Sequence, residues 1–209
     1  MRIGILSSLL ALFLPQLVVA QFNSFKAGSY ILDKSRQTRH DAQLKLKSDK
    51  LLVAKDANGE TLKLTPKDIY SFRIEQQRYR TASGFEIKSG FSGEIIDEVF
   101  VTLLDSGKVL LMRYDYISGS AMRVGAGGAM MGGGGFPQEV YLIRGAKSYS
   151  TPAVVSGGNS AKAKAALQAT LSPYVAQRPD LAKLLADGQI YEGNLFAFIR
   201  ALNTGLSFK

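Results

Sequence analysis

The chain contains a single histidine, His40, which is followed by Asp41 and preceded by Ser35. A serine hydrolase needs a serine nucleophile, a histidine base and an orienting carboxylate that meet in space. The Gly-x-Ser-x-Gly turn that presents such a serine is missing, because Gly90-Phe91-Ser92-Gly93 is followed by Glu94. We therefore expect His40 to be an exposed, non-catalytic residue in a polar loop or at the start of a strand.

Glu94, Asp97 and Glu98 form an acidic cluster. A glycosidase uses two carboxyl groups, one as an acid and the other as a base or nucleophile. Asp97 and Glu98 are consecutive, so on a strand their side chains point to opposite faces. Glu94 can join Asp97 only in a loop. The prediction is therefore a set of solvated charges at the entry to a strand, and a hydrolase that depends on carboxylates remains an alternative.

Glycine dominates residues 124–135. A loop that binds phosphate needs either Gly-x4-Gly-Lys-Ser/Thr or Gly-x-Gly-x-x-Gly leading into a helix, and neither spacing occurs. Phe136-Pro137 and a strand-like segment follow, so no helix N-terminus is expected there to hold an anion. The pattern predicts a mobile insertion in a hairpin, with Met130 and Met131 adding apolar surface. Closure over a ligand and contact with a membrane remain open roles for it.

Basic and aromatic residues alternate between positions 70 and 88. This interleaving is one that single-stranded nucleic acid binding uses. The residues are Arg73, Arg78, Arg80 and Lys88 together with Tyr70, Phe72, Tyr79 and Phe85. The basic residues are dispersed along the chain, so a general role in solubility, with charge spread over all faces, also explains them.

The composition excludes several chemistries. The 209 residues include no cysteine, so disulfides, cysteine-based metal sites and thiol nucleophiles are impossible. One histidine cannot make a multi-histidine metal site. We expect no cofactor, no metal ion and no catalytic residue.

Residues 1–20 have the three parts of a signal peptide, with Arg2 before an uncharged run that ends Val18-Val19-Ala20. The run also approaches the length of a membrane span, but Pro15 and the small final residue favour cleavage after Ala20. We expect an exported protein, periplasmic or extracellular, with no transmembrane segment after cleavage. Without Arg2, 25 basic and 17 acidic residues leave a net charge of +8. Export makes nucleic acid an improbable partner.

Residues 21–150 show the two-residue period of strands. Asn58-Gly59 and Asp105-Ser106-Gly107 each separate two such runs, which is a hairpin signal. The segment Asp56–Glu60 lacks the final bidentate glutamate of a calcium loop, so it is interpreted as a turn. The fold class expected is α+β, an antiparallel β-sheet sandwich or partly closed barrel of about seven or eight strands followed by a small C-terminal helical region.

Residues 151–160 are expected to be a linker, and residues 161–209 a helical region. An alanine-rich helix is predicted from Ala161 to Leu171, with Pro173 ending or kinking it. A second helix is predicted after Pro179 with a stop at Gly188, and a third near residues 194–202. These short helices need partners for their apolar faces, so we expect them to pack on each other and on the sheet.

The order of these segments resembles uncharacterised exported proteins of Gram-negative bacteria. The resemblance rests on "KDANGETLKLTPKDIYSFRI", "DEVFVTLLDSGKVLLMRYDY", "YLIRGA" and "LQATLSPYVAQRPDLAKLLADGQIYEGNLFAFIRALN", and it covers most of residues 43–204. Its motifs are turn and core patterns without catalytic residues. It implies a strand-rich body with a short helical tail and an exported location, and it implies no activity.

Three functions from different classes remain. The first is a non-catalytic binding or structural accessory module of the bacterial envelope, with another envelope protein as a possible partner. The second is a binder of anionic surfaces such as lipid headgroups, lipopolysaccharide or acidic glycans, which a positive net charge favours. The third is the carboxylate-dependent hydrolase. The expectation is the first function, with the glycine-rich loop and the Arg/Tyr strands as the surfaces to test.

Overall fold

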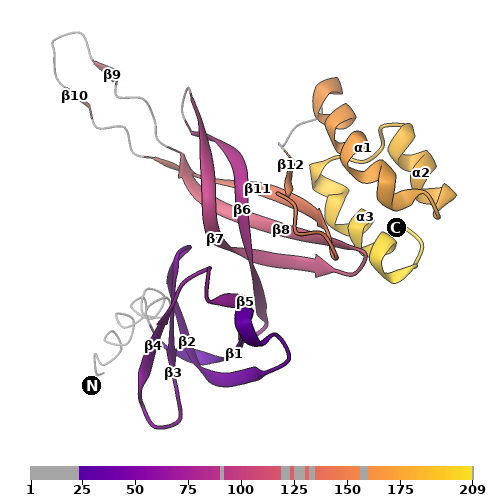
Figure 1. Ribbon diagram of the computed structural model, residues 1–209. Coiled ribbons are helices and arrows are strands. Elements are labelled where there is room, and N and C mark those ends of the chain that lie inside the picture. Colours follow the sequence, from indigo (N-terminus) through magenta and orange to yellow (C-terminus); the bar gives the residue numbers. More distant parts are fainter. Residues whose placement is uncertain are drawn as a thin grey trace, which may run out of the picture.

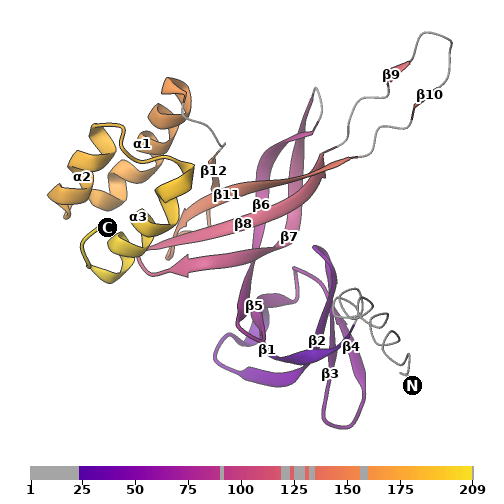
Figure 2. The same ribbon diagram turned by 180° about the vertical axis from the view of Figure 1, so that it is seen from behind.

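The computed structural model describes residues 24–89, 92–118, 123–124, 130–131, 135–155 and 160–208. Within them, ten strands form one antiparallel sheet in the order β12-β11-β8-β7-β6-β5-β1-β2-β3-β4. The sheet is not closed, since β12 and β4 lie at its two edges. The structure is therefore rich in sheet and has a helical C-terminal region, as expected for an α+β chain (Figures 1 and 2). It has ten strands in one sheet where about seven or eight, in a sandwich or partly closed barrel, were expected.

The elements follow one another along the chain with few long connections. The strands are β1 (Lys26–Leu32), β2 (Arg39–Ser48), β3 (Leu51–Lys55), β4 (Thr61–Leu64), β5 (Ile69–Ile74), β6 (Gln77–Ser89), β7 (Ser92–Ser106), β8 (Val109–Ser118), β9 (Arg123–Val124), β10 (Met130–Met131), β11 (Phe136–Gly145) and β12 (Ala153–Val155). The helices are the 3₁₀ turn η2 (Asp33–Ser35), α1 (Ala161–Val175), α2 (Pro179–Ala186) and α3 (Glu192–Thr204). The short strands β9 and β10 pair with each other.

Two of the ten strands, β1 and β12, were not expected from the sequence. β1 contains Gly28, and a Cβ atom there would lie 2.3 Å from the Arg73 carbonyl oxygen, so the neighbouring strand β5 approaches closely only because the side chain is missing. Such a glycine weakens the two-residue pattern. β12 has three residues and lies inside the segment 151–160 that was expected to be a linker.

The hairpin turn at residues 56–60 forms, but by a different geometry from the one expected. Gly59 alone has a positive φ, +88°. The Asp56 side chain accepts hydrogen bonds from the Asn58 and Glu60 backbone amides, both at 2.9 Å. The aspartate therefore organises a longer loop in place of a two-residue primed turn. The turn between β5 and β6 holds Glu75 at a φ of +52°.

The core divides into three clusters because β8 is buried on both faces. Val109 and Leu111 contact the helices, and Leu110 and Met112 contact the opposite face. All four side chains are 5% exposed or less, so this stretch of the sequence is apolar at every position and does not alternate between apolar and polar residues. The third cluster fills the space enclosed by β1–β5, with Phe100 of β7 packed into it.

Helix α1 is longer than expected and continues through Pro173 to Val175. Proline removes one backbone hydrogen bond and disfavours the helix interior. Leu167, Leu171 and Val175 are nevertheless all buried, and their four-residue spacing places them on one stripe against the sheet and α3. Burial of this stripe outweighs the lost hydrogen bond. Helix α2 begins at Pro179, and Gly188 follows it with a φ of +65°, both as expected.

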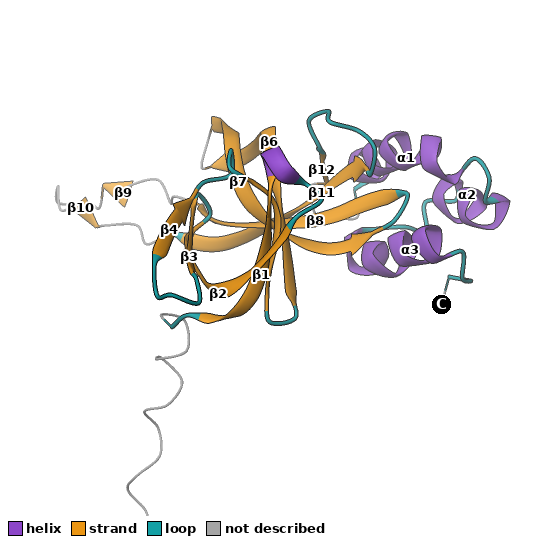
Figure 3. Ribbon diagram, turned by 60° about the horizontal axis from the view of Figure 1, so that its bottom comes forward, coloured by secondary structure: helices purple, strands orange, loops and turns teal. Residues whose placement is uncertain are grey.

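The helices gather at one end of the long strands (Figure 3), and the Asn203 side chain holds α3 there. Asn203 of α3 accepts from the Val109 amide at 3.0 Å and donates to the Val109 carbonyl at 2.9 Å and to Asp105 at 3.0 Å. A Cβ atom on Gly107 would lie 2.6 Å from the Asn203 side chain. The β7–β8 turn is therefore fitted to the end of α3, and α3 is fixed to the sheet.

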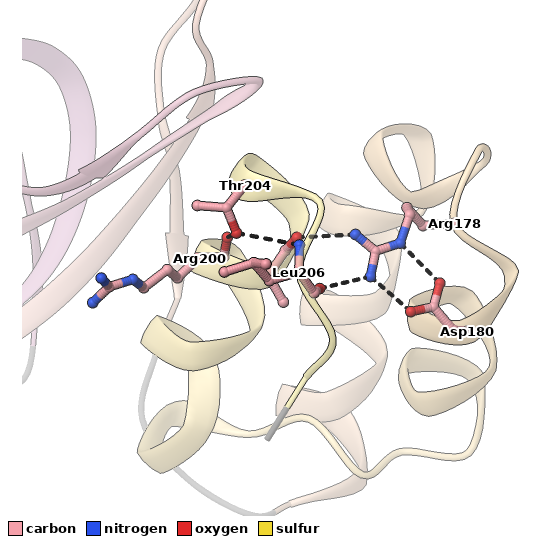
Figure 4. Close-up of polar contacts among 6 residues, drawn as sticks. Arg178, Asp180, Arg200, Thr204 and Leu206 are labelled. Atoms are coloured by element: carbon pink, nitrogen blue, oxygen red, sulfur yellow. Dashed lines mark hydrogen bonds and ion pairs between the residues drawn. The ribbon is translucent and has the colours of Figure 1, made fainter.

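Arg178 joins the start of α2 to the end of α3 (Figure 4). It makes two hydrogen bonds to Asp180, at 2.9 and 2.7 Å, and donates to the Ala201 and Leu206 carbonyl oxygens at 3.0 and 2.9 Å. Carbonyls at a helix C-terminus lack partners within the helix and carry partial negative charge. The Ala201 carbonyl also accepts from the Gly205 amide, and Leu206 follows the end of α3, so the guanidinium group adds to the contacts of this turn and its role there is structural.

The sheet curls strongly across its C-terminal half. β12 lies close to β6, although β11, β8 and β7 stand between them in the sheet order. This curvature brings the end of β11 and the loop after it towards the middle of β6. Residues far apart in the sequence meet there, and they form the cleft described next.

Candidate functional site: a cleft lined by arginines

A cleft of about 230 Å³ opens where η2, the β4–β5 loop, β6, β7 and the end of β11 meet. Four cationic and two acidic side chains line it, which leaves two positive charges in excess. We call it the arginine cleft, and its charged residues are Arg36, Lys67, Arg80, Arg144, Asp33 and Glu98. Tyr70 and Tyr149 also line it.

Tyr70 lies between two guanidinium groups. The Arg80 Cζ lies 3.9 Å and the Arg36 Cζ 4.6 Å from the centre of its ring. Arg80 reaches this position because its strand pairs Arg80 with Ser71, the residue next to Tyr70. The electron-rich ring face attracts cations and orients them. The ring therefore fixes two of the cleft's arginines without neutralising either.

Arg36 has several partners at the mouth of the cleft. Its Nη2 and Nε donate to Asp33 at 2.6 and 3.2 Å, and its Nη1 donates to the Tyr149 hydroxyl at 3.0 Å. These hydrogen bonds, with Asp33 first, raise the pKa of Arg36. Tyr149 is 82% exposed, yet Arg36 holds it in place. Arg36 therefore builds the rim from segments 113 residues apart.

Arg144 is half-buried and differs from Arg36 in its partners. Burial lowers the pKa of Arg144, and the nearby Arg80 cation lowers it further. The Arg144 Nε is buried and has no hydrogen-bond partner among the described residues. Among the residues that the structure describes, neither Arg80 nor Arg144 forms an ion pair with a carboxylate. Two like charges thus share the cleft while neither is ion-paired, which is unfavourable in a partly desolvated place.

Glu98 contributes the other unsatisfied group of the cleft. Its Oε2 is buried and has no hydrogen-bond partner within the described part of the chain. Asp97, the preceding residue of β7, is exposed on the other face. A buried acceptor without a donor costs about 1–3 kcal/mol. The cleft therefore presents unused donors and one unused acceptor side by side.

This arrangement is suited to binding an anion. Guanidinium groups make strong, directional hydrogen bonds to phosphate and carboxylate oxygens. An anion between Arg80 and Arg144 removes their mutual repulsion and satisfies the buried nitrogen. No group positioned as a nucleophile lines the cleft among the described residues, which bring Ser83 and Ser148 to it without a histidine.

In a second hollow, around Asp49 and Tyr114, two of the charged groups have close partners, although the buried Arg113 Nε makes no hydrogen bond of good geometry among the described residues. The Tyr114 hydroxyl donates to Asp49 at 2.9 Å, and burial followed by this hydrogen bond raises the pKa of Tyr114. Arg113 lies 3.1 Å from the Asp115 carboxylate. The hollow is therefore a less suitable site for a charged ligand than the arginine cleft.

His40 lies on β2, where it stacks on Tyr30 with ring centres 5.0 Å apart. It is the second residue of that strand, which agrees with the expected place at a strand start, but the side chain is only partly exposed and its Nε2 is buried without a partner among the described residues. Stacking against a core tyrosine explains the partial burial. The nearby Asp41 bonds to Arg39 at 3.0 Å and not to the histidine.

The acidic cluster is placed within β7 and not at its entry, since the strand begins at Ser92. Asp97 and Glu98 point to opposite faces, as expected. Glu98 is only partly solvated, however, because its Oε2 is buried while the residue as a whole stays partly exposed. This is the largest difference between the expected and observed roles of these carboxylates.

The Arg/Tyr strands do not form one continuous surface. Phe72 and Phe85 are core residues, and Tyr79 stacks on Phe72 with ring centres 4.5 Å apart. Arg80 and Tyr70 alone of that set line the arginine cleft. The signal peptide, residues 1–20, lies outside the described residues, and so does most of the glycine-rich segment 124–135.

Sequence reasoning missed Arg36, Lys67, Arg144 and Tyr149. They come from three separate segments, the turn at Arg36, the β4–β5 loop and the end of β11 with the loop after it, so no local spacing connects all of them. One signal was visible, because Arg144 follows the apolar run Val140–Ile143 in a strand whose end is buried. A cation in such a position needs either a partner or a ligand.

Two kinds of feature are absent from the residues that the structure describes. In that part of the chain, no group of three or more His, Asp or Glu side chains is placed so that it could hold a metal ion. None of its helices combines the length and the apolar character needed to cross a membrane.

Comparisons with known proteins found no match to a protein-family model, to a curated protein or to a solved structure.

Proposed function

We propose that the chain is an exported, non-catalytic module that binds an anionic group of an envelope or extracellular molecule in the arginine cleft. One observation carries the proposal. Arg80 and Arg144 approach each other in a partly buried cleft with no carboxylate paired to either within the described residues. A bound anion supplies the missing counter-charge.

The alternatives are less well supported by the geometry. Glu98 is separated from Asp97 by the strand itself, so the consecutive carboxylates do not form a pair that could divide acid and base roles. A purely structural role leaves the buried Arg144 Nε and Glu98 Oε2 unexplained, because structural polar groups are normally satisfied.

The exported location belongs to the same proposal. It rests on the leader pattern of residues 1–20 and on the resemblance to uncharacterised exported proteins of Gram-negative bacteria. An exported binder meets anionic sugars and lipids before it meets any nucleic acid. The net charge of the chain, +9 with the leader, attracts such anions over a distance of about 10 Å at moderate salt.

The test is titration of the purified protein, produced from the full chain, with inorganic phosphate by isothermal calorimetry. Wild-type protein is expected to bind phosphate, and raising the salt concentration should weaken the binding because the attraction is partly screened. Arg144→Gln removes a charged donor worth about 1.4 kcal/mol or more, so the affinity should fall about tenfold or further.

The matched control is Arg73→Gln. Arg73 is exposed on β5, so this change removes the same charge outside the cleft. It should leave the phosphate affinity within about twofold of wild type, since a distant exposed charge acts only through a screened field. Circular dichroism confirms that each variant folds. Absence of phosphate binding in the wild type, or equal losses in both variants, would overturn the proposal.

A further inference from the structure

We infer that the ligand of the arginine cleft is a phosphorylated monosaccharide, free or carried on a lipid, whose phosphate lies against Arg80 and Arg144 while a sugar hydroxyl donates to Glu98. The inference rests on the proposed function and names its ligand. It is drawn from the unsatisfied acceptor, the charge, the size and the rim of the cleft.

Glu98 is the first reason to look beyond a bare anion. Its Oε2 is buried and unpartnered in the cleft that holds Arg144. A carboxylate repels a second anion and accepts hydrogen bonds only from a donor. The ligand therefore has to present a donor close to its negative charge. A hydroxyl group of a sugar meets this need, because it adjoins the phosphate on the same ring.

The net positive charge of the cleft favours an anionic ligand over a zwitterionic one. Its lining carries two positive charges in excess, with Asp33 already bonded to Arg36. A zwitterion such as phosphoethanolamine offers an ammonium donor for Glu98 but little net charge. A phosphate monoester carries about −1.5 to −2 at neutral pH. The monoester therefore matches the excess charge, and its sugar provides the donor without adding a cation.

Size limits how much of the ligand enters. Drug-sized ligands occupy pockets of about 300–1,000 Å³. The arginine cleft measures about 230 Å³, so it takes one sugar ring with its phosphate and not an oligosaccharide. Any further part of the ligand extends out of the mouth.

The rim offers an aromatic surface for the sugar. Tyr149 is 82% exposed, and the hydrogen bond from Arg36 holds its ring at the mouth of the cleft. A large exposed aromatic ring held in place is a feature of binding sites. The apolar face of a pyranose ring packs on it while the hydroxyl groups at its edge point towards the polar lining.

The experiment compares three probes by isothermal calorimetry: inorganic phosphate, glucose 1-phosphate and glucose. Wild-type protein should bind glucose 1-phosphate about tenfold more tightly than phosphate, because one further hydrogen bond to a charged group contributes about 1.4 kcal/mol. Glucose alone should bind far more weakly than either.

Two variants assign this preference to Glu98. Glu98→Ala should bring the glucose 1-phosphate affinity down to that of phosphate, and it should leave phosphate binding unchanged or stronger since a repelling charge is gone. Asp97→Ala removes the neighbouring carboxylate, which is exposed on the other face, and should keep the wild-type preference. Glu98→Gln keeps the shape and one acceptor oxygen, so an intermediate preference is expected.

The outcomes separate the two proposals. If phosphate binds and glucose 1-phosphate binds no more tightly, the sugar inference fails and the anion site stands. If Glu98→Ala still prefers glucose 1-phosphate to phosphate, Glu98 does not accept a hydrogen bond from the sugar hydroxyl, and the inference also fails. If neither anion binds, the proposed function fails first.

A further arm identifies the source of the sugar phosphate. The protein is sedimented with phosphatidylcholine vesicles that do or do not contain lipid A, whose glucosamine units carry phosphate. Retention that requires lipid A, and that glucose 1-phosphate competes away, supports a membrane-borne ligand. Binding of the free sugar phosphate alone supports a soluble one. Retention by lipid A that glucose 1-phosphate does not displace contradicts a shared site.

Discussion

Two arginines of this protein, Arg178 and Arg144, use the same guanidinium group in opposite ways. Arg178 makes hydrogen bonds to a carboxylate and to two backbone carbonyls where α2 and α3 meet. Arg144 lies half-buried beside another cation, with its Nε unpartnered among the described residues. Saturated contacts indicate a structural role, and unused donors beside a cleft indicate a site that a ligand completes.

The same contrast separates two regions along the strands, the end next to the helices and the middle of β6 and β7. At the helical end, Asn203 satisfies both backbone groups of Val109 and bonds to Asp105. At the cleft, Glu98 keeps a buried oxygen without a donor. One region is therefore closed and the other is incomplete, although both are built on β7 and its neighbours. If this distinction is correct, substitutions at the closed end cost stability, and substitutions in the cleft cost binding.

The largest expected effect is that of Asn203→Ala. Loss of the side chain leaves the Val109 amide and carbonyl without partners next to a fully buried residue, so the free energy of unfolding should fall by about 2 kcal/mol. Urea unfolding followed by circular dichroism measures it. The comparison is Asn194→Ala, which removes the exposed N-terminal cap contacts of α3 and should cost about 1 kcal/mol or less. Equal losses would argue against a special role for Asn203.

The second effect contrasts the two arginines directly. Arg178→Gln removes the hydrogen bonds that join α2 to α3, so the melting temperature should fall by several degrees. Arg144→Gln relieves the repulsion from Arg80, so the melting temperature without ligand should stay the same or rise slightly. Differential scanning calorimetry of both variants decides the matter. A large fall in the melting temperature of Arg144→Gln would mean that this arginine has a structural partner in solution, and it would contradict the contrast with Arg178.

The smallest effect is a pH dependence at the closed end. The hydrogen bonds from Arg178 hold the pKa of Asp180 at about 2, below its ordinary value of 3.8. A carboxyl group whose pKa is lower in the folded state stabilises the fold above the unfolded value, and this contribution disappears as the pH falls through the folded value.

Wild-type protein should therefore melt at a higher temperature than Asp180→Asn at neutral pH, and the gap should close between pH 3.8 and about 2. Comparing the two proteins at each pH removes the contribution of the other carboxyl groups, because both contain them. A gap that stays constant over this range would show that the ion pair does not couple to folding.

Much of the secondary structure could be predicted from local patterns. The turn residues Asp56–Gly59 and Asp105–Gly107 mark hairpins that the structure contains. Pro179 starts α2, and Gly188 follows its end. These signals work because turn geometry and helix ends depend on neighbouring residues. Pro173 misled the prediction, since burial of Leu171 and Val175 outweighs a local preference that the sequence shows plainly.

The arginine cleft could be predicted only in fragments. Arg80 and Tyr70 belonged to a recognised basic and aromatic pattern, and Glu98 to a recognised acidic cluster. Nothing in the sequence connects them with Arg36 or Arg144, because the meeting of η2, β6 and the end of β11 depends on how strongly the sheet curls. The curl brings together strands that are not neighbours in the sheet, and the sequence shows no local pattern for such contacts.

The sequence by itself determined the repeating order of strands followed by helices, the hairpin turns and the absence of cysteine chemistry, because each of these depends on residue type or on close neighbours. Only the tertiary structure decided which charged groups found partners. Arg178 and Arg144 are both arginines next to ordered elements, and their difference arises from what the folded chain brings within hydrogen-bonding distance of each. Long-range packing sets that distance, so the sequence alone cannot distinguish the arginine whose guanidinium group is fully hydrogen-bonded from the one whose Nε has no partner among the described residues.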